Sequence, residues 1–213
     1  MIQKTNILIK DLGTRDYKNV WNFQKNLQQK IILGKQPDTL LLVEHKPVYT
    51  MGKNGNPDHV LQKRPRNTKI YQVERGGDIT FHGPGQLVGY PIIDLHHYEK
   101  SISWYMRTLE TMLIQTLGNF GIEGVLKEGL TGVWVEDEKI AALGVRISRW
   151  VTMHGFALNV NTDLEYYESI IPCGIFEYGV TSMQELIGEE INMQTLKDTL
   201  KVEFLNSFGQ VNS

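Results

Sequence analysis

Residues 75–90 read Arg75-Gly76-Gly77-Asp78-Ile79-Thr80-Phe81-His82-Gly83-Pro84-Gly85-Gln86-Leu87-Val88-Gly89-Tyr90, and the rest of the chain is organised around them. Five of these sixteen residues are glycine. Ordinary turns need only one or two glycines to supply a positive φ angle or a tight reversal. Glycines at this density let the backbone come close to another group, and the polar side chains between them face what it approaches. We therefore expect this stretch to form part of a binding site.

The composition is that of an ordinary soluble globular protein. Hydrophobic residues make up 41% and charged residues 22% of the 213 residues, a length that can bury a sizeable core. The formal net charge of −2 shows no basic excess, so neither nucleic acid nor a membrane is an expected partner. No apolar run is long enough for a membrane span, and residues 1–6 lack a secretory signal pattern, so we expect a cytoplasmic location. The single cysteine excludes an internal disulfide.

Apolar side chains recur at helical spacing in three segments. Amphipathic helices are therefore expected over residues 14–34, 101–120 and 192–208. A shorter helix is expected at residues 163–171, and another begins at the capping-box sequence Ser182-Met183-Gln184-Glu185.

Short apolar or alternating segments predict strands between these helices. The segments are residues 39–43, part of 44–53, 70–74, 79–82, 86–95, 132–136, 139–146 and 151–161. Gly76-Gly77-Asp78 suits a hairpin turn, and Pro91 indicates a sheet edge or a bulge. Hairpin-like connections, rather than strict strand–helix alternation, favour the α+β class. We expect one domain over residues 1–213, with a mixed, largely antiparallel sheet flanked by helices.

Cys173, the only thiol, lies in the loop sequence Pro172-Cys173-Gly174. A free cysteine is more often a small buried apolar residue than a nucleophile. A loop thiol is accessible, but an unperturbed thiol is mostly protonated at pH 7, so a catalytic cysteine needs a neighbouring cation or base. Lys139, His82 and His154 are the candidates, and each has an ordinary structural explanation: a solvated strand-end lysine or a hydrogen-bonded interior histidine.

Other kinds of site fit the sequence less well. The glycine stretch lacks the Gly-Lys-Ser/Thr ending of a phosphate-binding loop and opens no clear helix. No pair among the six histidines has a convincing helical i, i+4 metal-ligand spacing, and adjacent His96 and His97 would point to opposite faces of a strand. No Gly-x-Ser-x-Gly nucleophile elbow is present. We therefore expect no metal.

The glycine stretch resembles the signature of the lipoyl(octanoyl) transferases, which belong to the biotin/lipoate protein ligase superfamily. Four further blocks resemble that family in the same order: Glu44-His45-Lys46-Pro47-Val48-Tyr49-Thr50-Met51-Gly52, Gly132-Val133-Trp134-Val135 with Lys139-Ile140-Ala141-Ala142-Leu143-Gly144, His154-Gly155-Phe156-Ala157-Leu158-Asn159-Val160, and Pro172-Cys173-Gly174. The resemblance covers residues 40–183. Five blocks in order are far more specific than any one of them.

The resemblance implies an enzyme that transfers an octanoyl group from octanoyl-acyl carrier protein to the target lysine of apo lipoyl domains. The expected acceptors are those of the 2-oxo acid dehydrogenase complexes and the glycine cleavage H protein. It implies that Cys173 forms an acyl-thioester assisted by Lys139, and that no cofactor is needed because the acyl group arrives activated. The acyl pocket maps onto Arg75, Gly76, Gly77, Asp78, Ile79, Thr80, Phe81, His82, Ala142, Leu143, Gly144, His154, Gly155 and Phe156.

Two other functions stay open at this point. An ATP-dependent lipoate or biotin ligase would share the fold and need no cysteine nucleophile. A non-catalytic relative that binds acyl carriers would keep the glycine stretch as a scaffold. Exposed Lys and Arg residues within 54–69 are candidates for docking acidic carriers, although a solvated loop explains them equally well.

Overall fold

The computed structural model describes residues 6–61, 63–65, 68–171 and 178–209. Its main element is a mixed sheet with the strand order β1-β2-β6-β10-β9-β8-β7 and with β11 paired to β9. The strands are β1 (Leu8–Arg15), β2 (Thr39–His45), β6 (Gln86–Ile92), β7 (Val125–Lys127), β8 (Leu130–Val135), β9 (Glu138–Ser148), β10 (Val151–Asn159) and β11 (Gly179–Val180). Among the described strands of this sheet only the β1–β2 and β9–β11 pairs are parallel, which confirms the expected largely antiparallel α+β fold.

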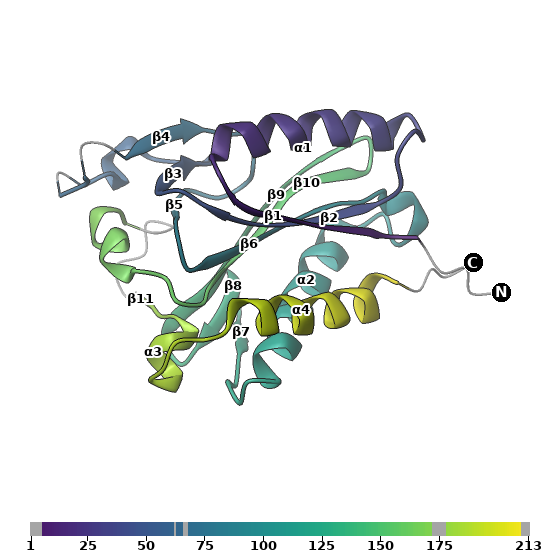
Figure 1. Cartoon of the computed structure of the whole chain (residues 1–213). Helices are drawn as coiled ribbons and strands as arrows, with labels where there is room; N and C mark the ends of the chain where they lie inside the picture. The colour runs from purple at the N-terminus through teal and green to yellow at the C-terminus, as the bar shows by residue number, and fades with distance from the viewer. Residues whose placement is uncertain (1–5, 62, 66–67, 172–177, 210–213) are drawn as a thin grey trace.

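Helices cover both faces of this sheet, as Figure 1 shows. Helix α1 (Tyr17–Ile32) packs on one face, whereas α2 (Ile102–Gly118) and α4 (Met193–Phe208) pack together on the other. Strand β2 explains why both faces are buried: Leu41 and Val43 join the core under α1, and Leu40 and Leu42 join the core under α2 and α4. A strand buried on both sides is a continuous apolar run, as this one is.

The expected long helices are confirmed to within a few residues, and their ends follow from side-chain caps. The Ser101 hydroxyl accepts a hydrogen bond from the Trp104 amide at the start of α2, and the Asn192 side chain accepts from the Thr195 amide at the start of α4. Ser182 caps the short helix α3 (Met183–Ile187) in the same way. Residues Leu164–Ser169 form a 3-10 helix, η3, where the sequence predicted a short helix.

A second, three-stranded sheet corrects the expected hairpin at residues 76–78. Its order is β4-β3-β5, with β3 (Val48–Met51) lying between β4 (Lys69–Gln72) and β5 (Ile79–His82). Strands β4 and β5 are therefore not paired. The carbonyls of Arg75, Gly77 and Asp78 instead accept hydrogen bonds from the amides of residues 52–54, which continue from β3. The glycine stretch thus clamps another loop instead of turning back on its own strand.

Pro91 lies in an interior strand, so the expected sheet edge is wrong. Strand β6 is flanked by β2 and β10, and Pro91 is opposite Leu40 of β2. Pairing between β6 and β10 ends at Gly89 and Phe156. The two segments pair again at an isolated bridge between Asp94 and Val151. A proline is tolerated here because no ladder bond to β10 needs its missing N–H.

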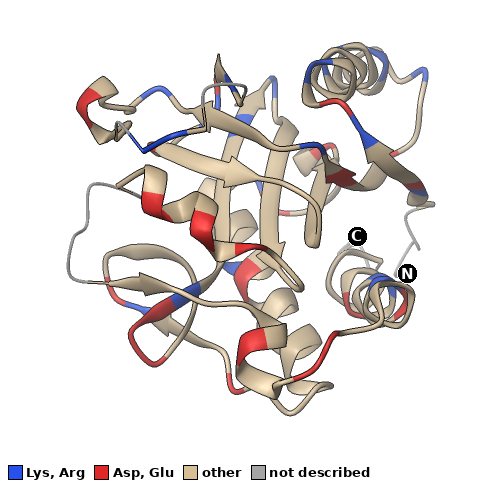
Figure 2. Cartoon of the chain, turned by 60° about the vertical axis from the view of Figure 1, so that its left-hand side comes forward, with Lys and Arg blue, Asp and Glu red and all other residues tan. Residues whose placement is uncertain are grey.

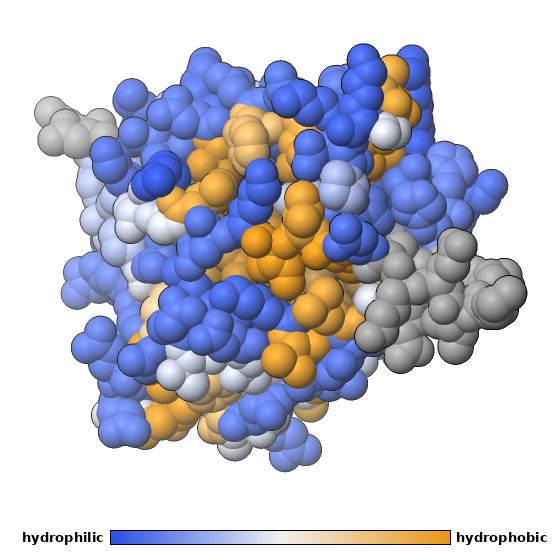
Figure 3. All heavy atoms as spheres, turned by 45° about the vertical axis from the view of Figure 1, so that its right-hand side comes forward, coloured by the Kyte–Doolittle hydropathy of each residue, from blue (hydrophilic) through white to orange (hydrophobic). Residues whose placement is uncertain are grey.

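The surface is mainly polar. Figure 3 shows hydrophilic residues over most of one face and an apolar area near its centre. Within the described part of the chain, none of the helices is long and apolar enough to cross a lipid bilayer.

Candidate active site

One cavity of about 670 Å³ gathers the residues that the sequence singled out. Its walls come from the glycine stretch (75–80 and 82), from β9 (Lys139 and 142–144) and from β10 (154–156). The Gly76 amide donates to the Val145 carbonyl, which joins the glycine stretch directly to β9. Of the predicted acyl-pocket residues only Phe81 is absent from the walls.

The Arg75 side chain is buried at 8% exposure and holds the floor of this cavity together. Its guanidinium donates to the Thr50 carbonyl at 2.6 Å and to the Thr50 hydroxyl at 3.0 Å. It also donates to the Gly76 carbonyl at 2.9 Å. The charge is thus built into the junction between β3 and the glycine stretch.

Three buried histidines in this region, His45, His82 and His154, are neutral at physiological pH. Burial lowers the pKa of His45 to about 4. Burial, with smaller contributions from His45 and Arg75, lowers the pKa of His82 to about 3, and burial with the Arg75 charge does the same to His154. Neutral imidazoles cannot serve as cations for a thiolate, so of the three candidate partners Lys139 alone offers a charge.

Two tyrosines to which the sequence assigned no individual role complete this cluster. The Tyr17 ring stacks on His82, with centroids 5.9 Å apart, and the Tyr90 hydroxyl lies 2.8 Å from Nε2 of His45. Tyr17 opens α1, and its position there looked like an ordinary core position. Burial raises the pKa of both hydroxyls, so they stay protonated.

His154 has an unusual backbone conformation for an interior strand. Its φ is +63°, in the left-handed region that non-glycine residues rarely adopt. The turned amide donates to the Gln24 side chain of α1 at 3.0 Å. The residue is 2% exposed, and its ring Nε2 finds no hydrogen-bond partner among the described residues. An unsatisfied buried nitrogen on a cavity wall is available to a polar group of a bound molecule.

Lys139 reaches the cavity from the start of β9. It is the cross-strand partner of Trp134 in β8, and its Nζ lies 4.7 Å from the centre of that ring. On its other side it pairs with Val180 of β11, and its carbonyl accepts from the Thr181 amide. The sequence marked the lysine but gave no reason to choose Trp134.

Cys173 lies outside the described residues, as do Pro172 and Gly174. The described residues on either side of the segment 172–177 are Ile171, which is hydrogen-bonded to a wall residue of the cavity, and Tyr178, which is a wall residue itself. Ile171 donates its amide to the carbonyl of His59, which lines the cavity. Tyr178 lines it too, with its ring 5.3 Å from that of Trp134.

Gly144 and Gly155 border other backbone segments closely and leave no open space beside them. A Cβ at Gly155 would lie 2.3 Å from the Gly89 carbonyl oxygen, and one at Gly144 would lie 3.0 Å from the Gly76 carbonyl oxygen. Both glycines are needed because another segment of backbone approaches closely. Gly76 is different, since its nearest contact would be 3.8 Å away.

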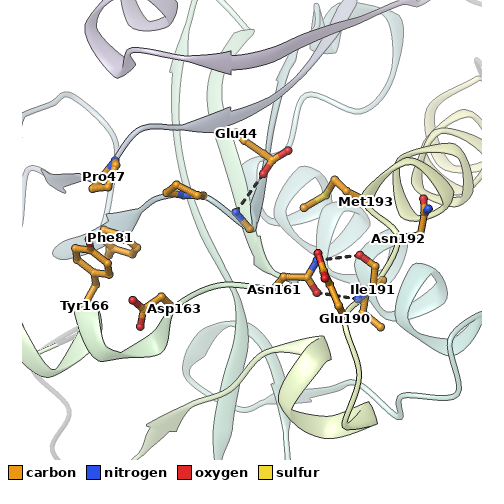
Figure 4. Close-up of a pocket in the computed structure, with 12 residues that line it drawn as sticks. Glu44, Pro47, Phe81, Asn161, Asp163, Tyr166, Glu190, Ile191, Asn192 and Met193 are labelled. Atoms are coloured by element: carbon orange, nitrogen blue, oxygen red, sulfur yellow. Dashed lines mark hydrogen bonds between the residues drawn. The ribbon is translucent and has the colours of Figure 1, made fainter.

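A second cavity, of about 810 Å³, lies on the other side of residues 83–85. Phe81 belongs to it, stacked on Tyr166 with ring centroids 4.3 Å apart. Figure 4 shows Glu44 accepting a hydrogen bond from the Gly85 amide, and Asn161 exchanging two with Ile191. It contains neither Lys139 nor the histidine cluster.

The described residues contain no group of three or more His, Cys, Asp or Glu side chains arranged to hold a metal. What the site offers is a lysine ammonium, a buried guanidinium, neutral hydrogen-bonding rings and apolar walls. The fold and this cavity together define a protein of the biotin and lipoate ligase fold class. Solved structures agree: a putative lipoate protein ligase from T. acidophilum matches with a TM-score of 0.70 at 13% identity, covering 96% of this chain and 85% of that chain.

Biotin protein ligase from Aquifex aeolicus matches more loosely, with a TM-score of 0.52 at 12% identity over 97% of this chain and 70% of that one. The model of the lipoyl protein ligase A/B catalytic domain matches residues 16–205. The chain belongs to that family.

Among curated proteins, an octanoyltransferase of Gloeobacter violaceus is 50% identical over 203 residues, covering 95% of this chain and 90% of its own length. One of Flavobacterium johnsoniae is 48% identical, covering 86% and 88%. At this identity the chain is an acyltransferase of the octanoyltransferase type.

Proposed function

We propose that this enzyme moves an octanoyl group from octanoyl-acyl carrier protein to the target lysine of apo lipoyl domains through a thioester on Cys173. One observation carries the proposal. Lys139 lines the same cavity as the glycine stretch, and the chain enters and leaves the segment that contains Cys173 at residues beside that cavity. The 50% identity to an octanoyltransferase supports the choice of acyl group.

The reaction is a pair of acyl exchanges. The Cys173 thiolate attacks the carrier thioester, and one thioester replaces another at nearly equal free energy. The amine of the acceptor lysine then attacks and forms an amide, which is more stable. No nucleotide is required because the donor is already activated.

Lys139 supports the first step through its charge. Only a few per cent of an unperturbed thiol is ionised at pH 7, and a neighbouring ammonium favours the thiolate. When the carrier thiolate leaves, the ammonium can give it a proton and become an amine. The pair of Lys139 and Cys173 thus holds one proton in the resting enzyme and none in the acyl-enzyme.

The cavity suits an acyl chain with a polar head. Ile79, Leu143 and Phe156 supply apolar wall, and Arg75 and His154 supply polar groups at the floor. Sites of a few hundred cubic ångströms lined in this way are typical for small molecules.

Both protein substrates are expected to be acidic, and the acceptors we propose are the lipoyl domains of 2-oxo acid dehydrogenase complexes and the glycine cleavage H protein. Lys63, on the segment between β3 and β4, and Lys69, the first residue of β4, are exposed and close in sequence to the cavity residue His59. Figure 2 shows basic residues along the loops above the acidic η3. Lys63 lies 3.8 Å from Glu168, an exposed pair that an acidic partner can displace. A cytoplasmic location is part of this proposal.

The test compares the enzyme with its Cys173→Ser variant in a mixture of octanoyl-carrier and apo lipoyl domain without ATP. We expect transfer by the enzyme and its loss in the variant. Full activity of the variant, or a strict need for ATP, would favour the ligase reaction that shares this fold. Binding of the carrier without any transfer would favour a non-catalytic relative.

A further inference from the structure

A histidine–aspartate pair that the sequence did not single out lies on the wall of the same cavity. His59, at the end of the 3-10 helix η1 (Pro57–His59), is hydrogen-bonded through Nδ1 to Oδ2 of Asp78. The Asp78 carboxylate is fixed at its other oxygen by the amides of Ile79, at 2.7 Å, and Asn56, at 3.1 Å. An aspartate that accepts from Nδ1–H leaves the opposite ring nitrogen, Nε2, as the basic atom.

The backbone around His59 is tied to the element that precedes Cys173. The His59 carbonyl accepts from the Ile171 amide at 2.9 Å, Val60 forms an antiparallel bridge with Ile170, and the Leu61 amide donates to the Ser169 carbonyl at 2.9 Å. The imidazole is therefore held beside the start of the segment that carries the thiol. Its side chain is 21% exposed, so it contacts both the cavity and solvent.

The second acyl exchange, which rests on the proposed function, releases one proton more than Lys139 can accept. The acceptor lysine arrives as an ammonium, because an ordinary lysine has a pKa of about 10.4. It loses two protons before the amide is complete, while the C–S bond to Cys173 breaks and the sulfur leaves as a thiolate. The Lys139 amine takes one proton, which restores the resting ammonium–thiolate pair. The other proton must go to a second base and then to solvent.

We propose that His59, oriented by Asp78, accepts this second proton from the acceptor lysine and passes it to water. Imidazole exchanges protons readily near neutral pH, and a carboxylate at Nδ1 fixes its tautomer. The position at the solvent edge of the cavity provides the exit. The Lys139 amine then accepts the proton that stays in the enzyme and restores the resting pair with the Cys173 thiolate. His59 accepts the second proton, which is released to solvent.

The charged and titratable groups around His59 come from several elements. Asp58 precedes it in η1, Asp78 of the glycine stretch is hydrogen-bonded to it, and Arg75 of the same stretch lines the cavity. Tyr167 of η3 and Lys139 of β9 line the same cavity.

The test separates the two exchanges. Single-turnover mass spectrometry follows formation of the octanoyl adduct on Cys173, and then its transfer to apo lipoyl domain, for the enzyme and for His59→Asn and His59→Ala. Asparagine keeps a donor at the position of Nδ1 but has no basic nitrogen. The matched control is His96→Asn, because His96 is hydrogen-bonded to Asp94 at 2.6 Å in the same way but is 48% exposed and is not a wall residue of the cavity.

We expect His59→Asn to form the adduct at the normal rate and to transfer it about tenfold or more slowly at pH 7. The defect should shrink toward pH 10, where the acceptor arrives as an amine, and added imidazole should reduce it. Transfer at the normal rate by His59→Asn at pH 7, with a defect only in His59→Ala, would make His59 a loop anchor and overturn the inference. Absence of the adduct in the unmodified enzyme would overturn the proposed function and this role together.

Discussion

Lys139 and Trp134 face each other across strands β8 and β9, with the lysine Nζ 4.7 Å from the centre of the indole ring. Tyr178, the first described residue after the segment that contains Cys173, packs against the same ring. Trp134 is 1% exposed, so its position is fixed by the core. One aromatic side chain therefore contacts both the lysine and Tyr178.

Replacing Lys139 should slow acylation of the enzyme by octanoyl-carrier. The Lys139→Ala variant loses the charge that favours the thiolate, so the loss should be greatest near neutral pH and smaller above pH 8.5, where a thiol ionises unaided. The rate of adduct formation measured from pH 6 to 9 checks this. Lys127→Ala is the control, since its Nζ also lies over Trp134, at 5.3 Å, but Lys127 is not a wall residue of the cavity. Equal rates for Lys139→Ala and the unmodified enzyme at pH 7 would remove Lys139 from the mechanism.

The aromatic face of Trp134 should affect the rate of acylation more than the volume of its side chain does. A cation–π contact contributes about 0.5–2 kcal/mol, which corresponds to roughly 2- to 30-fold in rate if it positions the ammonium. Trp134→Leu should show that loss in acylation, whereas Trp134→Phe, which keeps an aromatic face, should lose less. Thermal unfolding of both variants controls for the lost packing. Identical rates in two folded variants would mean that the ring face has no part in placing Lys139.

The buried histidines predict a steep loss of stability in mild acid. Their folded pKa values, about 4 for His45 and about 3 for His82 and His154, lie below the unfolded value near 6.5. Between these limits the unfolded chain binds protons that the folded chain cannot, so stability is complete above pH 6.5 and falls as the pH drops toward 4.

Each such histidine contributes a slope approaching about 1.4 kcal/mol per pH unit. Urea unfolding at pH 7, 6 and 5 measures it, and His82→Gln should flatten the curve while His96→Gln leaves it unchanged. A free energy of unfolding that stays constant from pH 7 to 5 would show that these rings are protonated in the folded state.

Two glycine substitutions should change the stability of the fold in opposite directions. Gly155→Ala places a methyl group 2.3 Å from the Gly89 carbonyl oxygen and 2.6 Å from Cδ of Pro91, which should cost about 1–3 kcal/mol. Gly118→Ala, at the end of α2, meets nothing within 4 Å and should stabilise by up to about 1 kcal/mol. Denaturant unfolding of the two variants measures whether the free energy of unfolding falls in the first and rises in the second. If Gly155→Ala is as stable as the unmodified protein, β6 and β10 do not approach as closely as described.

The long elements could be predicted from sequence because local rules determine them. The helix at Ile102–Gly118 follows from one apolar face and the Ser101 cap, and the strand at Thr39–His45 from a continuous apolar run. Strand β1 was missed, since Leu8–Arg15 is half exposed and edge-lying and has few apolar residues. The hairpin at 76–78 was wrong because β3 inserts between β4 and β5, a long-range pairing that turn chemistry cannot reveal.

The residues of the site also divide into those that the sequence could identify and those that it could not. The glycine stretch, Lys139 and the block at His154 were found because several short blocks resembled one family. His59 and Tyr17 were missed because each occurs in a pattern that a loop or a core explains. Trp134 belongs to a block that resembles the family, but the sequence assigned it no individual role. Only the fold brings His59 beside Asp78, nineteen residues away, and Trp134 beside Lys139.

The central claim is that Cys173 carries the acyl group between two protein substrates. Intact-protein and peptide mass spectrometry of the enzyme after incubation with octanoyl-carrier alone tests it most directly. The account predicts an octanoyl adduct on Cys173 that disappears when apo lipoyl domain is added, with the same mass appearing on the acceptor lysine. Absence of an adduct at every pH, together with ongoing transfer to the acceptor, would contradict it.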